Sequence, residues 1–166
     1  MEEENNNSFL TFQVNGALYG VSVARVVEIQ AYAKPDATPS GLPYMLGLTQ
    51  HRGSILPLID SSAKFGMQPI QITPQTYVVV IAVKNADELF DVALAVDEVR
   101  EVVNISDENK MKIDSTYKPG YVAFASNTNA GLVMVLDPDK VFTDTDVISM
   151  ADISAQANKA NLADKQ

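Results

Sequence analysis

The chain has 166 residues, 46% of them hydrophobic, which is enough for one domain or two small subdomains with a real core. The formal net charge is −9 and the lysines and arginines are scattered, so the sequence predicts no nucleic-acid partner. The absence of cysteine excludes disulfides, thiolate metal sites and a cysteine nucleophile.

The ends of the chain differ in composition from its middle. Residues 1–8 are acidic and polar, where a secretory signal would be basic and then apolar. The longest strongly apolar run, 77–83, is far too short to cross a bilayer. We therefore expect a cytoplasmic protein without direct membrane insertion, with a disordered segment at 1–8, a domain at 9–142 and a polar C-terminal tail or helix at 143–166.

The first elements predicted along the chain form a β-hairpin. Apolar and polar residues alternate over 9–14 and again over 17–23, and Asn15-Gly16 between them is a strong two-residue turn signal. The spacing then changes to that of a short helical turn over 23–29. A strand is the alternative there, because the same valines and isoleucine are good strand formers.

Three later segments are short, rich in β-branched residues and bounded by turn-forming residues, which predicts strands at 54–60, 76–83 and 131–137. Pro57 lacks an amide donor, so its strand is predicted to be an edge strand or to contain a bulge. Since no long helical segment separates the strands, the sequence favours a mainly β fold over a parallel α/β fold.

The chain contains a weak internal repeat of two motifs. The first motif, V-x-x-V-x-E-(I/V), occurs as VARVVEI at 23–29 and as VDEVREV at 96–102. In the second motif an aspartate ends an apolar strand and a phenylalanine follows five residues later: Asp60 with Phe65, and Asp137 with Phe142. Two motifs in the same order predict a duplication that gives two similar β barrels packed through an apolar seam.

The sequence offers little catalytic equipment. His51, the only histidine, could form a Ser-His-Asp relay with Asp60 and with Ser54, Ser61 or Ser62. No nucleophile elbow is present, so a surface histidine is the favoured interpretation and a small hydrolase the remote alternative. Metal-ligand spacings and glycine-rich phosphate loops are also missing. We therefore expect no catalytic residues, metal or cofactor, and a module that works by binding.

One stretch, GLTQHRGSILPLIDSSAKFG at 47–66, carries a specific pattern: G-x-x-x-x-R-G-x-I-L-P-x-I-D with a lysine and Phe-Gly just beyond. With the hairpin, YVVVIAV, LFDVALAVDEVREVV and GLVMVLD in this order, the chain resembles the CheW family of bacterial chemotaxis coupling proteins from Phe9 to Phe142. The resemblance implies a mainly β fold with two small SH3-like five-stranded β-barrel subdomains packed together, short helices and a possible C-terminal helix.

The resemblance also implies a function. Members of the family are non-enzymatic adaptors that couple chemoreceptors to a CheA-type histidine kinase in chemotaxis signal transduction. The implied partners are the regulatory domain of the kinase and the cytoplasmic tip of the receptors, in receptor arrays at the membrane. A related adaptor in another signalling array, for surface motility or a second messenger, is the alternative with the same fold.

The resemblance implies a receptor-facing surface of six residues: Val26, Glu28, Gly47, Arg52, Gly53 and Thr76. Kinase-contact residues stay open, because the segment at 105–113, where the family approaches the kinase, matches its motif only loosely. The chain departs from the family at Gln50-His51, where Asn-Leu is usual, at Ser61, where leucine is usual, and over 121–131. These departures leave the identity of the receptor and kinase open.

Arg52 and Gly53 have a chemistry that suits display on a turn. A guanidinium group is planar and always charged, so it can bind a carboxylate or helix-end carbonyl groups through two parallel hydrogen bonds. Glycine permits positive φ and a close approach to a partner's backbone. The sequence therefore predicts one displayed cation at a tight turn.

Overall fold

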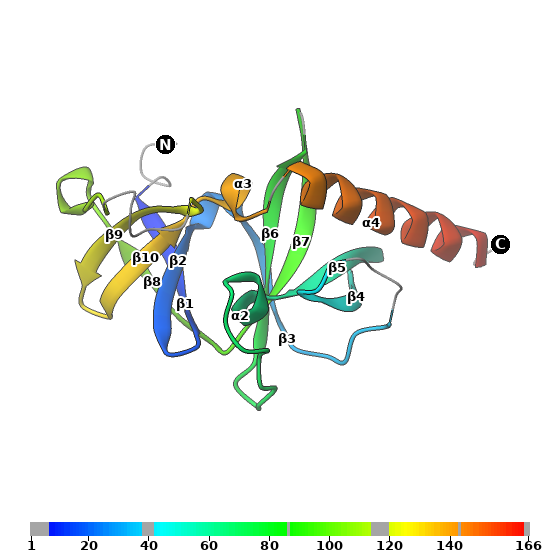
Figure 1. Ribbon diagram of the computed structural model, residues 1–166, viewed down its shortest axis with the longest axis horizontal. Coiled ribbons are helices and arrows are strands. Elements are labelled where there is room, and N and C mark those ends of the chain that lie inside the picture. Colours follow the sequence, from blue (N-terminus) through cyan, green and yellow to red (C-terminus); the bar gives the residue numbers. More distant parts are fainter. Residues whose placement is uncertain (1–6, 38–41, 86, 114–119, 143, 165–166) are drawn as a thin grey trace.

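The computed structural model describes residues 7–37, 42–85, 87–113, 120–142 and 144–164 (Figure 1). Two five-stranded sheets lie side by side, and a long helix runs along one of them. Sheet A contains, in spatial order, β8 (Glu98–Asn104), β1 (Ser8–Val14), β2 (Ala17–Ser22), β10 (Gly131–Leu136) and β9 (Val122–Thr128). Sheet B contains β3 (Val26–Ala31), β6 (Tyr77–Asn85), β7 (Glu88–Val96), β5 (Ser54–Asp60) and β4 (Met45–His51).

Short helical turns connect the strands: η1 (Val23–Arg25), α2 (Ser61–Lys64), η2 (Asp107–Asn109) and α3 (Pro138–Val141). The long helix is α4 (Asp144–Asp164). The predicted fold class, mainly β with two small five-stranded subdomains and few helices, is confirmed. Of the segment predicted to be disordered, residues 1–6 lie outside the described residues, and β1 begins at Ser8.

The predicted N-terminal hairpin is present as β1 and β2. Asn15 and Gly16 have φ of 50° and 82°, which is the geometry of a two-residue turn with positive φ at both positions. The helical turn predicted next covers only Val23–Arg25, and a strand starts at Val26. The strand alternative prevails from Val26 on because these residues pair with β6.

The prediction for Pro57, an edge strand or a bulge at that point, was wrong. The strand β5 lies between β7 and β4, and the register shift of the β4–β5 pair lies between Met45 and Gly47 of β4 rather than at Pro57. Pro57 faces Leu48 of β4, whose amide and carbonyl groups hydrogen-bond to Asp36 and not to β5. On the other side, pairing with β7 begins only at Leu58. The missing amide donor of Pro57 therefore interrupts neither ladder.

The internal repeat is visible in the structure, but its halves exchange strands. Sheet A combines β1 and β2 with β8, β9 and β10, whereas sheet B combines β3, β4 and β5 with β6 and β7. Each sheet thus takes two strands from one half of the chain and three from the other. Neither subdomain can complete its sheet from one half of the sequence alone.

Both motifs of the repeat occupy equivalent places. The V-x-E motif makes a β-bulge in each sheet, between Val26 and Glu28 in β3 and after Val99 in β8. The aspartates cap the two short helices: Asp60 accepts from the amide of Ala63, and Asp137 from that of Asp139. Their own amides donate to carbonyl groups of equivalent tyrosines, Tyr44 and Tyr121, each at 2.8 Å.

Most of the hydrophobic core lies between the sheets. A central cluster combines buried side chains of both sheets with Val141, Phe142 and Met150 from the helical segments that follow β10. Each sheet also encloses a smaller cluster of its own. Along β6, Val78 and Val80 face the cluster inside sheet B, and Val79, Ile81 and Val83 face the central cluster. This two-sided burial explains the continuous apolar run of β6, because the side chains on both of its faces are buried.

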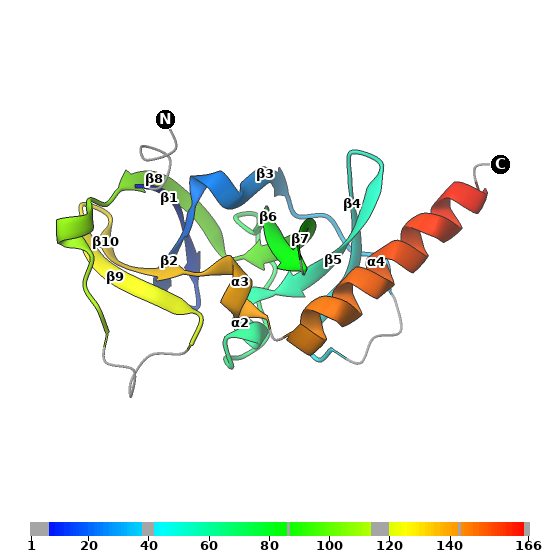
Figure 2. The same ribbon diagram turned by 90° about the horizontal axis from the view of Figure 1, so that it is seen from above.

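Helix α4 packs along sheet B (Figures 1 and 2). Met150 is fully buried in the central cluster. The Asn158 side chain accepts from the Ile55 amide at 2.8 Å and donates to the Ile55 carbonyl oxygen, which also accepts from the Ser154 hydroxyl. These polar side chains satisfy backbone groups of β5 at the place where β7 does not pair with it. No helix in the described part of the chain is both long and apolar enough to cross a membrane.

Candidate functional site

The β4–β5 hairpin displays Arg52 on its turn. Arg52 and Gly53 have φ of 50° and 81°, and His51 and Ser54 pair directly before and after them, which defines a two-residue turn. A non-glycine residue in this conformation costs about 1–2 kcal/mol, so the turn holds arginine where asparagine or glycine would be easier. The hairpin projects from sheet B (Figure 2). The Arg52 side chain is 75% exposed.

Glu28 of β3 contacts both residues at the end of β4. Its Oε2 lies 2.6 Å from Nδ1 of His51, and its Oε1 lies 3.7 Å from Nη2 of Arg52. His51 is only 6% exposed, so the interpretation as a surface histidine was wrong. The reason is barrel closure: β3 and β4 are opposite edges of sheet B, and its curvature brings them together. A bridge also joins Asp36, in the segment between β3 and β4, to Leu48 of β4.

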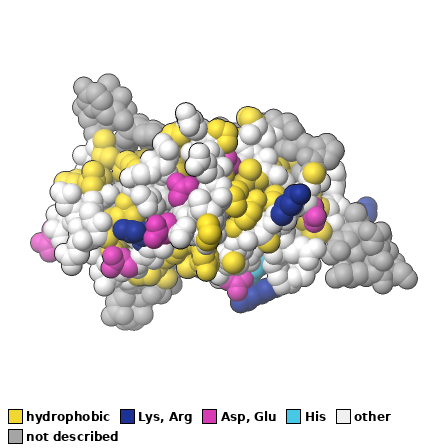
Figure 3. All heavy atoms as spheres, turned by 90° about the horizontal axis from the view of Figure 1, so that it is seen from below, with side chains coloured by type: hydrophobic (Ala, Val, Ile, Leu, Met, Phe, Trp, Pro, Cys, Tyr) yellow, Lys and Arg dark blue, Asp and Glu magenta, His cyan; other side chains and the backbone are white. Residues whose placement is uncertain are grey.

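A groove lies where the two sheets meet, and both sheets line it. It has a volume of about 410 Å³ and is lined by Ile29, Pro74, Gln75, Tyr77, Glu98 and Val99. Ile29 and Tyr77 leave about two fifths of their surface exposed, as does Val27 on the same strand as Ile29. Figure 3 shows hydrophobic side chains gathered across the middle of one face of the molecule. The groove thus offers an apolar surface next to the Glu28 position of β3.

Thr76 and Gly47 are shaped by their local backbone. Thr76 is 3% exposed; its hydroxyl accepts from the amide of Thr73 and its amide donates to the Thr73 carbonyl oxygen. It thereby fixes the turn that carries Pro74 at the groove. Gly47 has φ of 148°, and a Cβ there would lie 2.4 Å from the carbonyl oxygen of Asp36.

Of the six residues predicted to face a receptor, the structure brings Glu28, Arg52 and Gly53 together at one exposed place. Val26 is half-buried against the central cluster, and Gly47 and Thr76 have the structural roles just described. Sequence reasoning missed the residues that line the groove and the contact of His51 with Glu28. The sequence does contain a signal for the groove: β3 carries apolar residues at successive positions, and Val27 and Ile29 remain exposed because the strand buries only one face.

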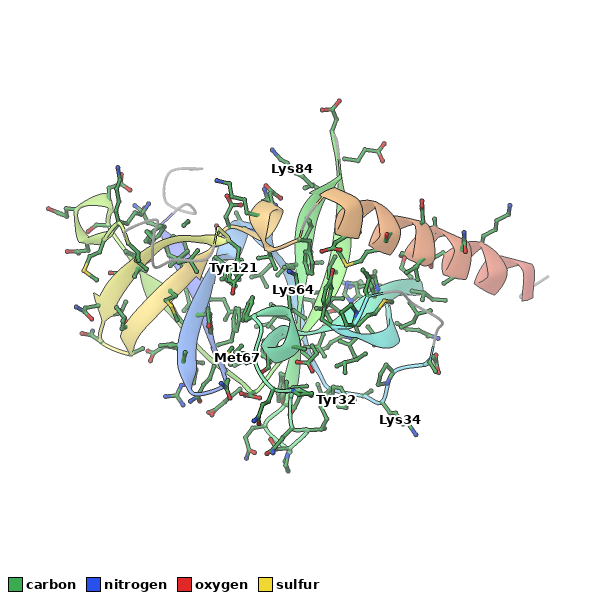
Figure 4. The ribbon with its side chains drawn as sticks, in the orientation of Figure 1. Tyr32, Lys34, Lys64, Met67, Lys84 and Tyr121 are labelled. Carbon is green, nitrogen blue, oxygen red and sulfur yellow. The ribbon has the colours of Figure 1, made fainter. Side chains whose placement is uncertain are left out.

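The lysine and phenylalanine that end the 47–66 motif lie at the seam between the sheets. The ammonium group of Lys64 lies 5.1 Å from the ring centre of Tyr44, and the ring of Phe65 stacks on Tyr121 at 5.0 Å. Figure 4 shows Lys64 and Tyr121 at the centre of the molecule. Burial lowers the pKa of Lys64, and the Asp146 carboxylate opposes this shift. This part of the motif therefore packs the two halves together.

The structure does not assemble the Ser-His-Asp relay. The Asp60 carboxylate accepts from the amides of Ala63 and Ile70, and the Ser62 hydroxyl donates to the Gln68 carbonyl oxygen. His51 contacts Glu28 instead. Among the described residues, no hydrogen bond or ion pair joins the side chain of His51 to Asp60 or to the side chains of the three candidate serines, Ser54, Ser61 and Ser62.

Comparison with known proteins agrees with the architecture. The family model of the CheW-like domain matches residues 8–146 of the chain. The chain is 30% identical over 104 residues to the chemotaxis protein CheW of Bacillus subtilis, and 30% identical over 105 residues to a probable chemotaxis protein CheW of Rhizobium etli. Each match covers 63% of this chain, and it spans just under two thirds of each relative, 64% and 65%.

A third relative and a solved structure cover more. The chain is 26% identical over 136 residues to the chemotaxis protein CheW of Rhizobium meliloti, which is 80% of this chain and 85% of that protein. The crystal structure of the scaffolding protein TtCheW from Thermoanaerobacter tengcongensis superposes with a TM-score of 0.72 at 19% identity, over 83% of this chain and 88% of that one. The likeness to TtCheW shows that the two chains share a fold. The family model covers most of the chain, and the chain belongs to the CheW family.

Proposed function

We propose that this chain is a non-enzymatic adaptor that couples chemoreceptors to a CheA-type histidine kinase in chemotaxis. Membership in the CheW family supports this proposal, as do the names of its relatives, which are chemotaxis proteins. The structural neighbour TtCheW is a scaffolding protein, which agrees with a role in binding rather than catalysis. In the proposed role the adaptor works in the cytoplasm and is recruited to receptor arrays at the membrane.

The observation that carries the proposal is a displayed cation near an apolar groove. A helical hairpin tip would present apolar ridges and carboxylates, so its binder needs an apolar surface edged by directed charge. The groove at Ile29 and Tyr77 supplies the apolar surface, and Arg52 supplies the charge. The two features meet on β3, where Glu28 contacts Arg52 and the next residue, Ile29, lines the groove. We assign the receptor to this surface, with the predicted residues Val26, Gly47, Gly53 and Thr76 supporting it.

The kinase regulatory domain would bind elsewhere on the adaptor, since coupling requires both partners at once. No residue is assigned to this contact. The segment at 105–113, which contains η2, is the part of the chain suggested by the family resemblance.

A pull-down tests the proposal. The purified protein is immobilised and offered the regulatory domain of the cognate kinase, and in a separate experiment a soluble cytoplasmic fragment of a cognate chemoreceptor. Retention of both fragments is expected. Retention of neither, with the immobilised protein folded by circular dichroism, would refute the adaptor function.

A further inference from the structure

We infer that His51 is a positioning residue whose protonation state sets how freely Arg52 can bind an acidic partner. This inference rests on the proposed function, because the partner is the carboxylate-bearing receptor tip. His51 also stands where the family resemblance leads one to expect leucine, so the contact belongs to this chain and not to the general pattern.

The His51 side chain fixes the position of Glu28. Nδ1 of His51 and Oε2 of Glu28 lie 2.6 Å apart, within ion-pair distance, and the histidine ring is buried while Glu28 is about one third exposed. The contact spans the two edge strands β3 and β4, so it holds the base of the Arg52 turn against β3. A leucine at this position could pack but could not bond to the carboxylate.

Sheet A provides an internal comparison. There Glu101 holds the repeat position of Glu28, and Thr128 holds that of His51, directly before the β9–β10 turn. The Thr128 hydroxyl donates to Gly131 within its own hairpin. Glu101 and Thr128 both line a cavity of about 420 Å³ between β8 and β9. In sheet B the residues at the equivalent positions, His51 and Glu28, contact each other directly.

Glu28 couples the charge of His51 to that of Arg52. Glu28 is shared: one oxygen faces His51 and the other faces Arg52. When His51 is neutral, Glu28 keeps an uncompensated negative charge that attracts Arg52. When His51 is protonated, it neutralises Glu28 and releases Arg52, and the site gains one positive charge. Both effects favour an acidic partner.

The groups that set this balance come from two elements. Glu28 faces His51 from β3, and Arg52 reaches the same carboxylate from the hairpin turn. The residue paired with His51 on β5 is Ser54, which carries no charge. Within the described ranges of the chain, Glu28 is the one residue that forms an ion pair with His51.

The test compares three chains: the unaltered protein, His51→Asn and His51→Leu. Asparagine keeps a neutral N–H donor near the place of Nδ1, and leucine restores the residue usual in the family. Binding to the soluble receptor fragment is measured by calorimetry at pH 5.5, 6.5 and 8.0, with the melting temperature of each variant at each pH. Dividing each Kd by that of His51→Asn removes any titration of the receptor fragment itself.

We expect the unaltered protein to bind roughly threefold tighter, relative to His51→Asn, at pH 5.5 than at pH 8.0, and the ratio of the two variants to stay constant with pH. A ratio for the unaltered protein that does not change with pH would overturn the inference and leave a packing role for His51. Absence of receptor binding by all three folded chains at every pH would instead count against the proposed function.

Discussion

Arg25 and Asp139 form a two-point ion pair that joins the halves of the chain. Nη1 of Arg25 lies 2.9 Å from Oδ1 of Asp139, and Nη2 lies 2.5 Å from Oδ2. Arg25 also donates to the carbonyl oxygen of Ala82, and the amide of Lys84 donates to Asp139. The pair is partly buried and connects η1 to α3 and β6. It therefore holds together segments that the strand exchange brings from opposite ends of the sequence.

Asp139→Asn should lower the free energy of unfolding by about 2 kcal/mol at pH 7, because hydrogen bonds between charged groups are lost while the shape is kept. The hydrogen bond from Arg25 is the main reason why the pKa of Asp139 lies below its usual value. A carboxylate with a depressed folded-state pKa stabilises the protein above its unfolded-state pKa, and this contribution is lost as the pH falls through the folded-state pKa.

Urea unfolding at pH 7, 5, 4 and 3 measures this effect. The difference between the unaltered protein and Asp139→Asn should stay constant from pH 7 to 5 and shrink below about pH 4. Asp152→Asn, at an exposed position of α4, is the matched control and should change little at any pH. An Asp139→Asn variant as stable as the unaltered protein at pH 7 would contradict the structural role of the pair.

Arg52→Asp should weaken binding of the receptor fragment by about 2 kcal/mol, roughly thirtyfold in Kd, without changing the fold. The turn tolerates the change because aspartate adopts positive φ more readily than arginine does. The control is Lys159→Asp, at an exposed position of α4, which changes the net charge by the same amount. Equal weakening by both variants would point to net charge alone, and a thermal melt that collapses for Arg52→Asp would make Arg52 a structural residue.

Gly47→Ala should destabilise the protein by about 2–4 kcal/mol, because its Cβ would collide with the Asp36 backbone in a conformation that favours glycine. Any loss of receptor binding should then accompany the loss of stability. Gly120→Ala, where a Cβ meets no atom within 4 Å, is the control and should unfold at nearly the same temperature as the unaltered protein. Lost binding by a fully stable Gly47→Ala would instead mark Gly47 as a direct contact.

Phe142→Ala should be more destabilising than Phe65→Ala, although the two phenylalanines are equivalent in the repeat. Phe142 is buried in the central cluster, whereas Phe65 is half-buried at its margin. Removing a buried phenylalanine side chain costs about 3–5 kcal/mol. Denaturant unfolding of both variants measures the loss of unfolding free energy in each. A larger loss for Phe65→Ala than for Phe142→Ala would contradict the packing of the central cluster described above.

Local signals in the sequence predicted the local parts of the fold well. Asn15-Gly16 can be recognised as a hairpin turn because its two residues need positive φ, which few residue types accept. The aspartates at 60 and 137 mark strand ends because each caps the helical turn that follows. The duplication could be found for the same reason, since each motif has a local structural purpose.

Contacts between residues that are distant in sequence could not be predicted from local patterns. The exchange of strands depends on pairings such as Ser8 with Asn104, which no local pattern encodes. The burial of His51 follows from closure of sheet B, where β3 meets β4 across the barrel. Docking of α4 through Asn158 likewise depends on a gap in the pairing of β5. The candidate site is therefore only half visible in the sequence, as Arg52 and Glu28 without the histidine that joins them.

The measurement that bears most directly on the proposed adaptor function is co-sedimentation of the kinase regulatory domain with receptor-bearing membranes. Vesicles that carry a cognate chemoreceptor are mixed with the regulatory domain, with and without this protein. We expect the kinase domain to sediment with the vesicles when the protein is present, and far less when it is absent or carries Arg52→Asp. Sedimentation of the kinase domain that is unaffected by adding the protein would contradict the adaptor function.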